Sequence, residues 1–286
     1  MVILGRVLLV LLIVALVDSA NISPICGKRQ LDETTLLPEG QTLPGQIPWH
    51  VSIYRYSEFL CGGSIVSPRL VITFAHLLAF WQYPSAYHFT AGLYDLENTT
   101  NSISYNVSEV IVHPEFIKTT SSNDIAILRA ASDILLGEPM KVLPICLPNG
   151  QAVKGITGQE LLNQRGILAG WEHPENVPSS SVLKWKAVRV IDLESCREKL
   201  PEKFHYALDN EAFCASRQDT GANIYPGDGG GGLAFIEDGV WYLHGLFSFA
   251  PNKLLDNGKV GFNQSGVFGF TDIARYIPWI NENLSK

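Results

Sequence analysis

The chain has 286 residues, of which 46% are apolar and 17% charged, and its formal net charge is −7 at pH 7. The composition is that of an ordinary globular protein. Because the charge is negative and no run of Lys or Arg occurs, the sequence argues against nucleic acid or an anionic membrane as a partner.

The first segment, residues 1–20, has the layout of a cleaved secretory signal. One basic residue, Arg6, precedes an unbroken apolar run over residues 7–17, and the small residues Ser19 and Ala20 follow. Such a run is too short for a stable membrane anchor. A buried N-terminal helix is the alternative. We therefore expect a secreted, extracellular protein, whose remaining length suits one large β domain or two small ones.

Secretion has consequences for two residue types. Asn-x-Ser/Thr triplets, which are candidate glycosylation sites in a secreted chain, occur at Asn21, Asn98, Asn106, Asn263 and Asn283. The five cysteines should pair in an oxidising compartment, and their odd number leaves at least one over. No two of them have a CxxC-type interval, so no structural metal site is expected. We also expect no cofactor.

Short runs rich in β-branched and aromatic residues, bounded by Gly, Pro, Asn and Ser, predict strands along most of the chain. In chain order they cover residues 50–56, 63–66, 70–74, 125–128, 166–170, 185–191, 240–247 and 266–270. Near the end, Ile273, Ile277, Ile280 and Leu284 recur at helical spacing, and Pro278 either starts or kinks that helix. The pattern predicts an all-β protein, a sandwich or a barrel, with a C-terminal helix.

Six short motifs follow one another along the chain. They are Cys61-Gly-Gly-Ser-Ile-Val66, Thr73-Phe-Ala-His-Leu77, Asn123-Asp-Ile-Ala-Ile-Leu128, Ile145-Cys-Leu-Pro148, Ala169-Gly-Trp171 and Gly227-Asp-Gly-Gly-Gly-Gly-Leu233. Together they resemble the trypsin-like, chymotrypsin-fold serine proteases, and Gly232 with the stretch 248–252 is most similar to insect modular serine proteases. The resemblance implies two antiparallel β-barrels, a protease domain over residues 36–286 and a light-chain-like segment over residues 21–35.

The resemblance assigns His76 as the general base and Asp124 as the carboxylate that orients it. Taken singly, a core histidine and a helix-capping aspartate are the alternatives. Gly229 stands at the nucleophile's position, and the N–H groups of Gly227 and Gly229 at the oxyanion hole. A glycine has no hydroxyl, and loss of the nucleophile costs about a millionfold in rate in a related triad enzyme.

Activation and specificity also depart from the family pattern. Such proteases are cut after a basic residue, and the new amino terminus pairs with the aspartate that is here Asp228. The corresponding junction, residues 35–39, has no basic residue before it, although Lys28-Arg29 lies upstream. Asp228 is then either a solvated turn residue or paired elsewhere. In the specificity pocket, Asn223 replaces the aspartate of a trypsin and Ala250 replaces a wall glycine.

The family's disulfides imply Cys26–Cys146 and Cys196–Cys214. Cys61 lacks its partner because that position is Leu77, so Cys61 is either a buried free thiol or a site of intermolecular bonding.

These features predict a non-catalytic protease homologue that acts by binding. The resemblance implies a cofactor, decoy or regulator in extracellular proteolytic cascades such as those of arthropod innate immunity, with extracellular proteases or their substrates as partners. One alternative is an active serine-type endopeptidase with an unconventional nucleophile, such as Thr220 or a water. Another is a duplicate without a role. We expect Gly229→Ser not to restore proteolysis.

Overall fold

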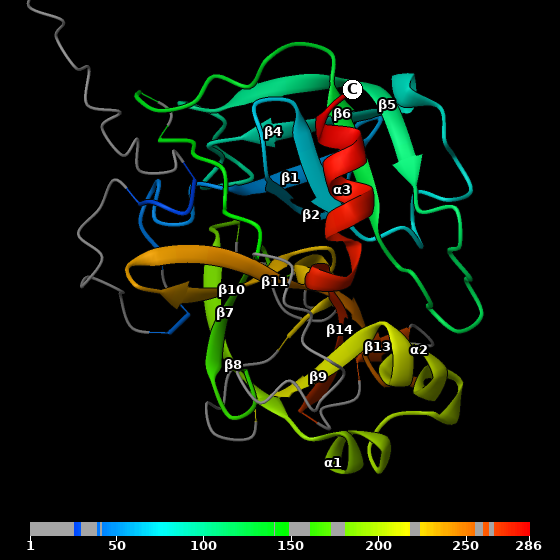
Figure 1. Ribbon diagram of the computed structural model, residues 1–286. Helices are drawn as coiled ribbons and strands as arrows, with labels where there is room; N and C mark the ends of the chain where they lie inside the picture. The colour runs from blue at the N-terminus through cyan, green and yellow to red at the C-terminus, as the bar shows by residue number, and fades with distance from the viewer. Residues whose placement is uncertain are drawn as a thin grey trace, which may run out of the picture.

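The chain forms two closed, six-stranded antiparallel β-barrels with a helix at the C-terminus, which confirms the predicted all-β fold (Figure 1). The computed structural model describes residues 26–29, 39–40, 42–139, 141–148, 161–172, 181–217, 224–254, 260–262 and 266–286. The predicted signal over residues 1–20 lies outside these ranges.

The first barrel is built from the first six strands of the chain, and the second from six later strands. The first has the order β1-β2-β3-β6-β5-β4 and comprises β1 (His50–Arg55), β2 (Glu58–Ile65), β3 (Leu70–Thr73), β4 (Tyr87–Ala91), β5 (Ile103–Val112) and β6 (Ala126–Ala130). The second has the order β10-β11-β14-β9-β8-β7 and comprises β7 (Arg165–Gly170), β8 (Lys184–Ile191), β9 (Ala212–Ser216), β10 (Gly232–Glu237), β11 (Val240–Phe249) and β14 (Val267–Asp272). A separate two-stranded sheet pairs β12 (Asn252–Leu254) with β13 (Val260–Phe262). Closure leaves neither barrel with an exposed strand edge.

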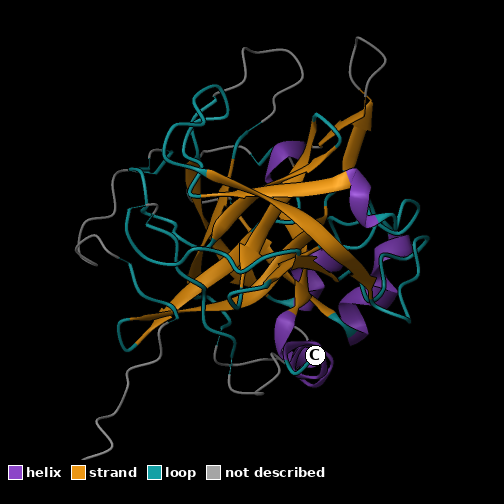
Figure 2. Ribbon diagram, turned by 90° about the horizontal axis from the view of Figure 1, so that it is seen from above, coloured by secondary structure: helices purple, strands orange, loops and turns teal. Residues whose placement is uncertain are grey.

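The helices are short and lie around the strands (Figure 2). They are α1 (Leu193–Arg197), α2 (His205–Asn210) and α3 (Ile277–Leu284), with 3₁₀ turns at Pro84–Ala86, Glu202–Phe204, Pro226–Asp228 and Ile273–Tyr276. Pro278 lies in the first turn of α3, where its missing N–H breaks no helical hydrogen bond. It therefore starts the helix rather than kinking it.

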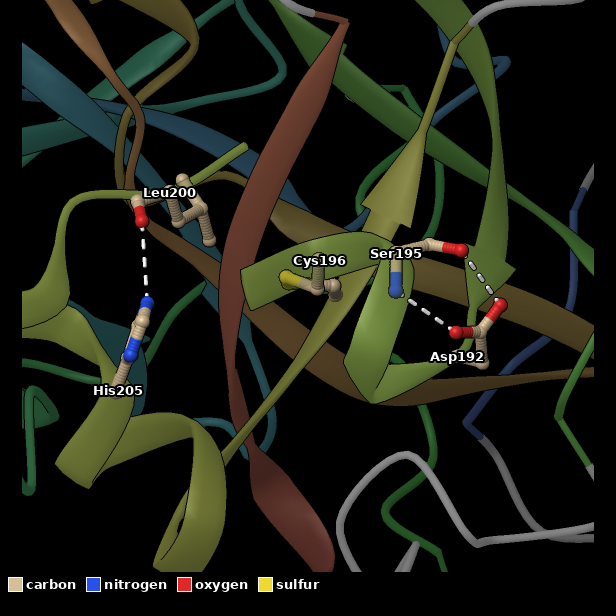
Figure 3. The surroundings of a disulfide bond; sticks show 6 residues. Asp192, Ser195, Cys196, Leu200 and His205 are labelled. Carbon is tan, nitrogen blue, oxygen red and sulfur yellow. Dashed lines mark hydrogen bonds between the residues drawn. A yellow bond between two sulfur atoms is a disulfide. The ribbon is translucent and has the colours of Figure 1, made fainter. Parts of the chain in front are cut away.

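Helix α1 is fixed by its cap and by a disulfide (Figure 3). The Asp192 carboxylate accepts hydrogen bonds from the backbone N–H and the hydroxyl of Ser195, each at 2.9 Å. These bonds, the backbone one first, lower the pKa of Asp192. Cys196, in the middle of α1, bonds to Cys214 on β9. The cap and the cross-link together hold this short helix against the second barrel.

Helix α3 leaves the second barrel and packs on the first (Figure 1). An Arg129 guanidinium nitrogen on β6 donates to the carbonyl of Asn283 at 3.1 Å. The ring of His113 meets those of Tyr276 and Trp279 edge-on, at centroid distances of 5.2 and 5.0 Å. The C-terminal helix thus joins the two barrels across the interface where the predicted site lies.

Apolar side chains form one core inside each barrel and a third between them. The third contains Trp49, Trp171 and Trp241, and the rings of Trp49 and Trp241 lie 6.0 Å apart. None of the helices in the described ranges is long and apolar enough to cross a bilayer.

Candidate functional site

His76 and Asp124 meet at the barrel interface. His76 follows β3, Asp124 precedes β6, and these strands are hydrogen-bonded neighbours in the first barrel. The Nδ1 atom of His76 lies 2.9 Å from Oδ2 of Asp124. Asp124 is fully buried, whereas the His76 side chain is 30% exposed. A carboxylate in this place holds Nδ1 protonated, so that the exposed Nε2 is free to accept a proton.

Every part of the Asp124 side chain is engaged. Its Oδ1 accepts the backbone N–H groups of Ala75 and His76 at 2.8 and 2.9 Å. Its Oδ2 also accepts the hydroxyl of Ser248 on β11. The structure places Asp124 as the partner of the imidazole and not as a helix cap. The Ser248 contact was not predicted, and it ties this carboxylate to the second barrel.

A pocket of about 480 Å³ opens beside His76, lined by Phe74, His76, Leu77, Lys118, Thr119, Ser121, Lys203, Phe204, Gly229, Phe247, Ser248, Phe249 and Ala250. His76 and Gly229 thus share one pocket, as the resemblance implies. The imidazole base and its carboxylate are present, but Gly229 offers no hydroxyl from which the base could take a proton.

Phe74 is a further unpredicted neighbour of the base. Its ring stacks on that of His76, with centroids 4.0 Å apart and an interplanar angle of 24°. Phe74 is buried, so the imidazole rests on a fixed apolar surface. This contact restricts the motion of His76 in addition to the Asp124 bond.

The glycine run has a structural reason at three of its four positions. Gly230 has φ of +72°, and an added Cβ would lie 2.4 Å from Thr73 Oγ1. At Gly231 the added atom would lie 2.7 Å from the carbonyl of Ala169, and at Gly232 it would lie 2.4 Å from Leu243 Cδ1. Gly230 and Gly231 therefore lack room for a side chain against the neighbouring backbone, whereas at Gly232 the Leu243 and Ser64 side chains would have to shift. Gly229 is the member of the run that lines the pocket.

Asp228 is fully buried and paired with a lysine, so the solvated-turn alternative is wrong. Its Oδ2 lies 2.5 Å from Nζ of Lys186, which is also fully buried on β8, and accepts the backbone N–H of Tyr225 at 2.8 Å. Burial raises the pKa of Asp228, and the Lys186 ammonium acts in the opposite direction. Asp228 lies between the predicted oxyanion donors Gly227 and Gly229, so this pair fixes the turn that carries them.

The Lys186 ammonium has further charged and polar neighbours. Glu172 lies 3.4 Å from Lys186 and 2.8 Å from Lys184. His50, on β1, is buried nearby with its ring 5.0 Å from that of Trp171. Burial first, and then the Lys186 charge, lower the pKa of His50 to about 3. His50 is therefore neutral at physiological pH, and Lys186 is the cation of this cluster.

Of the two predicted specificity-pocket residues, only Ala250 lies in the part of the chain that the structure describes. Asn223 lies outside the described residues. Ala250 is 4% exposed and belongs to the core of the second barrel together with Ile224, Phe249 and Phe268. The Phe249 ring occupies the space above Gly269, where an added Cβ would lie 2.0 Å from it. Ala250 and Phe249 also line the pocket beside His76, so Ala250 lies where that pocket meets the core of the second barrel.

The upstream basic pair is also held down. Arg29 is 8% exposed, and its guanidinium carbon lies 4.0 Å from the ring centroid of Trp241. Nζ of Lys28 donates to the carbonyl of Gly239 at 3.2 Å. These contacts reduce the access of a protease to the Lys28-Arg29 pair, because cleavage requires an accessible segment.

The cysteines lie as the resemblance implies. Cys26 bonds to Cys146 and Cys196 bonds to Cys214. Cys61 is a free, fully buried thiol 3.7 Å from the hydroxyl of Thr73, and burial raises its pKa to about 12. A thiol so buried and so weakly acidic cannot bond to another molecule without opening the first barrel.

Three of the five sequons fall in the described ranges. Asn98 and Asn106 are exposed. Asn283 is 4% exposed, and its Nδ2 donates to the carbonyl of Trp279 at 2.8 Å. A glycan needs that nitrogen, so the structure argues against Asn283 as an acceptor. Asn21 and Asn263 lie outside the described residues.

Comparison with known proteins agrees with this geometry. A sequence model of the family described as Trypsin matches residues 39–280. The chain belongs to the trypsin family. Among the described residues no three His, Cys, Asp or Glu side chains are grouped to hold a metal ion.

Curated relatives of this trypsin family member come from several animals. The chain is 27% identical to the proclotting enzyme of Tachypleus tridentatus, over 92% of the chain and 70% of that protein. It is 26% identical to the CLIP domain-containing serine protease B4 of Anopheles gambiae, over 92% of the chain and 73% of that protein. It is 26% identical to vitamin K-dependent protein C of Oryctolagus cuniculus, of which it spans only 51%.

Proposed function

We propose that the chain is a secreted, non-catalytic member of the trypsin family that acts by binding, as a cofactor, decoy or regulator of an extracellular proteolytic cascade. The observation that carries this proposal is Gly229, which lines the pocket shared with His76 and has no hydroxyl. Loss of the nucleophile alone costs about a millionfold in rate in an enzyme of another fold that uses the same kind of triad. No metal or cofactor is part of the proposal.

The rest of the site supports a protein that binds a ligand rather than a duplicate without a role. The His76–Asp124 pair, the buried Lys186–Asp228 pair and an open pocket of about 480 Å³ persist beside the missing hydroxyl. Buried ionic pairs are sensitive to the loss of either partner. A site that keeps them without a nucleophile is suited to holding a ligand that it does not cleave.

The extracellular setting rests on residues 1–20 and on the two disulfides. We place the protease-like domain at residues 36–286 and a light-chain-like segment at 21–35. Two of the relatives are named as a proclotting enzyme and a CLIP domain-containing protease, which supports a cascade such as that of innate immunity. The partners would be extracellular proteases or their substrates.

The test of inactivity uses the secreted full chain beside active trypsin. We expect no labelling by a serine-hydrolase fluorophosphonate probe and no cleavage of tripeptide amides. Labelling of the wild-type chain, traced by mass spectrometry to Thr220 or any other residue, would overturn the proposal in favour of an enzyme with an unconventional nucleophile.

The test of binding uses the extracellular fluid of the source organism. We expect immobilised wild-type chain to enrich a defined protein, and Gly229→Leu, whose side chain would enter the pocket, to lose it. Folding of that variant is checked by thermal unfolding. Enrichment of no protein by the wild type would favour a duplicate without a role.

A further inference from the structure

Two lysines lie at the pocket beside His76. Lys118 comes from the segment between β5 and β6 of the first barrel, and Lys203 from the 3₁₀ turn Glu202–Phe204 of the second. None of the described residues that line the pocket is Asp or Glu. The whole chain has 28 acidic and 21 basic residues, so this cationic lining runs against the charge of the molecule.

Both ammonium groups rest on aromatic rings. Nζ of Lys118 lies 3.8 Å from the centroid of Phe80, which is 59% exposed. Nζ of Lys203 lies 4.7 Å from the centroid of Phe204, whose ring stacks on Phe249 at 4.5 Å. Among the described residues neither lysine has a carboxylate within ion-pair distance. The two cations are thus positioned without being neutralised.

The pocket between the lysines has apolar side chains as well as the hydroxyl groups of Thr119, Ser121 and Ser248. Leu77 and Phe249 line it, with Phe74 and Phe247. A volume of about 480 Å³ holds a few side chains of a peptide. Apolar walls with two unpaired cations match a ligand that combines an apolar group with a carboxylate.

We propose that this pocket binds a peptide segment of a protein partner that carries acidic side chains beside apolar ones. The inference rests on the proposed function, because an uncleaved ligand needs an inactive site. The carboxylates pair with Lys118 and Lys203, and the apolar side chains pack on Leu77 and Phe249. Two lysines are too few for a polyanion such as nucleic acid, which needs an extended basic surface.

The experiment measures fluorescence anisotropy of rhodamine-labelled hexapeptides with the full chain. The probes are Ala-Phe-Glu-Asp-Leu-Ala, its neutral match Ala-Phe-Gln-Asn-Leu-Ala and its basic match Ala-Phe-Lys-Arg-Leu-Ala. We expect the acidic probe to bind about tenfold more tightly than the neutral one, since two ion pairs contribute, and the basic probe to bind weakest. Raising the salt concentration should narrow the difference.

Lysine variants locate the binding. Lys118→Gln and Lys203→Gln should each weaken binding of the acidic probe about threefold and leave the neutral probe unchanged. Lys286→Gln is the matched control, because Lys286 is exposed and outside the pocket, and it should change nothing. The reversal Lys118→Glu with Lys203→Glu should make the basic probe the tightest, a gain that misfolding cannot produce.

The outcomes separate the two proposals. Equal affinity for acidic and neutral probes, no binding of any probe at millimolar concentration, or no reversal by the double Glu variant each overturns the acidic preference. None of these results bears on inactivity, which is decided by fluorophosphonate labelling.

Discussion

Gly229 is the residue on which the chemistry of the site depends. We predict that Gly229→Ser restores labelling by a fluorophosphonate probe, because His76 and Asp124 keep a triad-like distance of 2.9 Å. We also predict no measurable cleavage of tripeptide amides that carry Arg or Lys, because Asn223 offers no carboxylate to a basic side chain and the methyl of Ala250 narrows the predicted specificity pocket. Restored nucleophilicity and absent substrate binding are thus expected in one protein.

A matched control for this prediction is His76→Ala in the Gly229→Ser background, which should abolish labelling. Cleavage of basic substrates within tenfold of trypsin would show that Asn223 and Ala250 do not prevent binding of a basic side chain. Absence of labelling would show that the 227–229 turn does not supply its oxyanion donors.

Lys186 is the residue that the structure adds to the predicted site. Lys186→Met should lower the free energy of unfolding by about 3–5 kcal/mol, because it leaves the Asp228 carboxylate buried without its cation. The double variant Lys186→Met with Asp228→Asn should recover part of this loss. Equilibrium denaturation by urea measures both, and a loss below about 1 kcal/mol for the single variant would contradict the assignment.

His50 should make stability depend on pH. Its folded pKa of about 3 lies below its unfolded value of 6.5, so the unfolded chain binds more protons between these limits. This contribution to stability is complete above pH 6.5 and is lost as the pH falls toward 3. We expect His50 to lower the free energy of unfolding by about 1 kcal/mol between pH 6.5 and 5.5, and His50→Gln to remove this part of the slope. An unchanged slope would sink the prediction.

The turn from Asp228 into β10 is the element that places the site. Gly232→Ala should cost about 1–3 kcal/mol, because the added methyl would lie 2.4 Å from Leu243 Cδ1 and 2.5 Å from Ser64 Oγ. Combining it with Ser64→Gly should cost less than the sum of the two single changes, as measured by thermal unfolding. Strict additivity would mean that the turn relaxes away from Ser64.

At the scale of the element, the sequence predicts the positions of strands better than it predicts the partners of their buried side chains. Runs rich in β-branched and aromatic residues predict strands that overlap β1, β2, β3, β6, β7, β8, β11 and β14. No such run predicts β4, β5, β9, β10, β12 or β13. The key signal in β8 was present, since Lys186 shares the buried face with Val188 and Val190. A lysine at a core-facing position demands a buried anion. The resemblance predicts a new amino terminus as the cation that pairs with Asp228, and it carries no prediction about a lysine on β8.

Other parts of the site could not be read from the sequence. The stacking of Phe74 on His76 depends on side-chain orientation at the end of β3. Lys118 and Lys203 lie 85 positions apart in the sequence. They line the same pocket only because the two barrels face each other across it. Such pairs arise from tertiary packing, on which local propensity carries no information.

At the scale of the whole molecule, residues 26–29 are bound to distant parts of the chain at several points. The N–H of Gly27 donates to the carbonyl of Pro144 at 2.8 Å, and the N–H of Trp241 donates to the carbonyl of Gly27 at 2.9 Å. The Cys26–Cys146 disulfide and the Arg29–Trp241 contact lie beside these bonds. Lys186 already pairs with Asp228, the residue that corresponds to the aspartate that binds the new amino terminus in the proteases that the chain resembles. These features predict a molecule that works uncut.

We therefore predict that trypsin cleaves the folded chain slowly after Lys28 and Arg29. Trp241→Ala, which removes the ring beneath Arg29, should accelerate this cleavage, followed by mass spectrometry. The cut chain should stay joined through Cys26–Cys146, and hydrogen exchange over residues 224–233 should not change, because Asp228 already has its cation in Lys186. A large fall in exchange over these residues after cutting would mean that a new amino terminus displaces Lys186. The uncut chain would then be a precursor, with its site completed only by proteolysis.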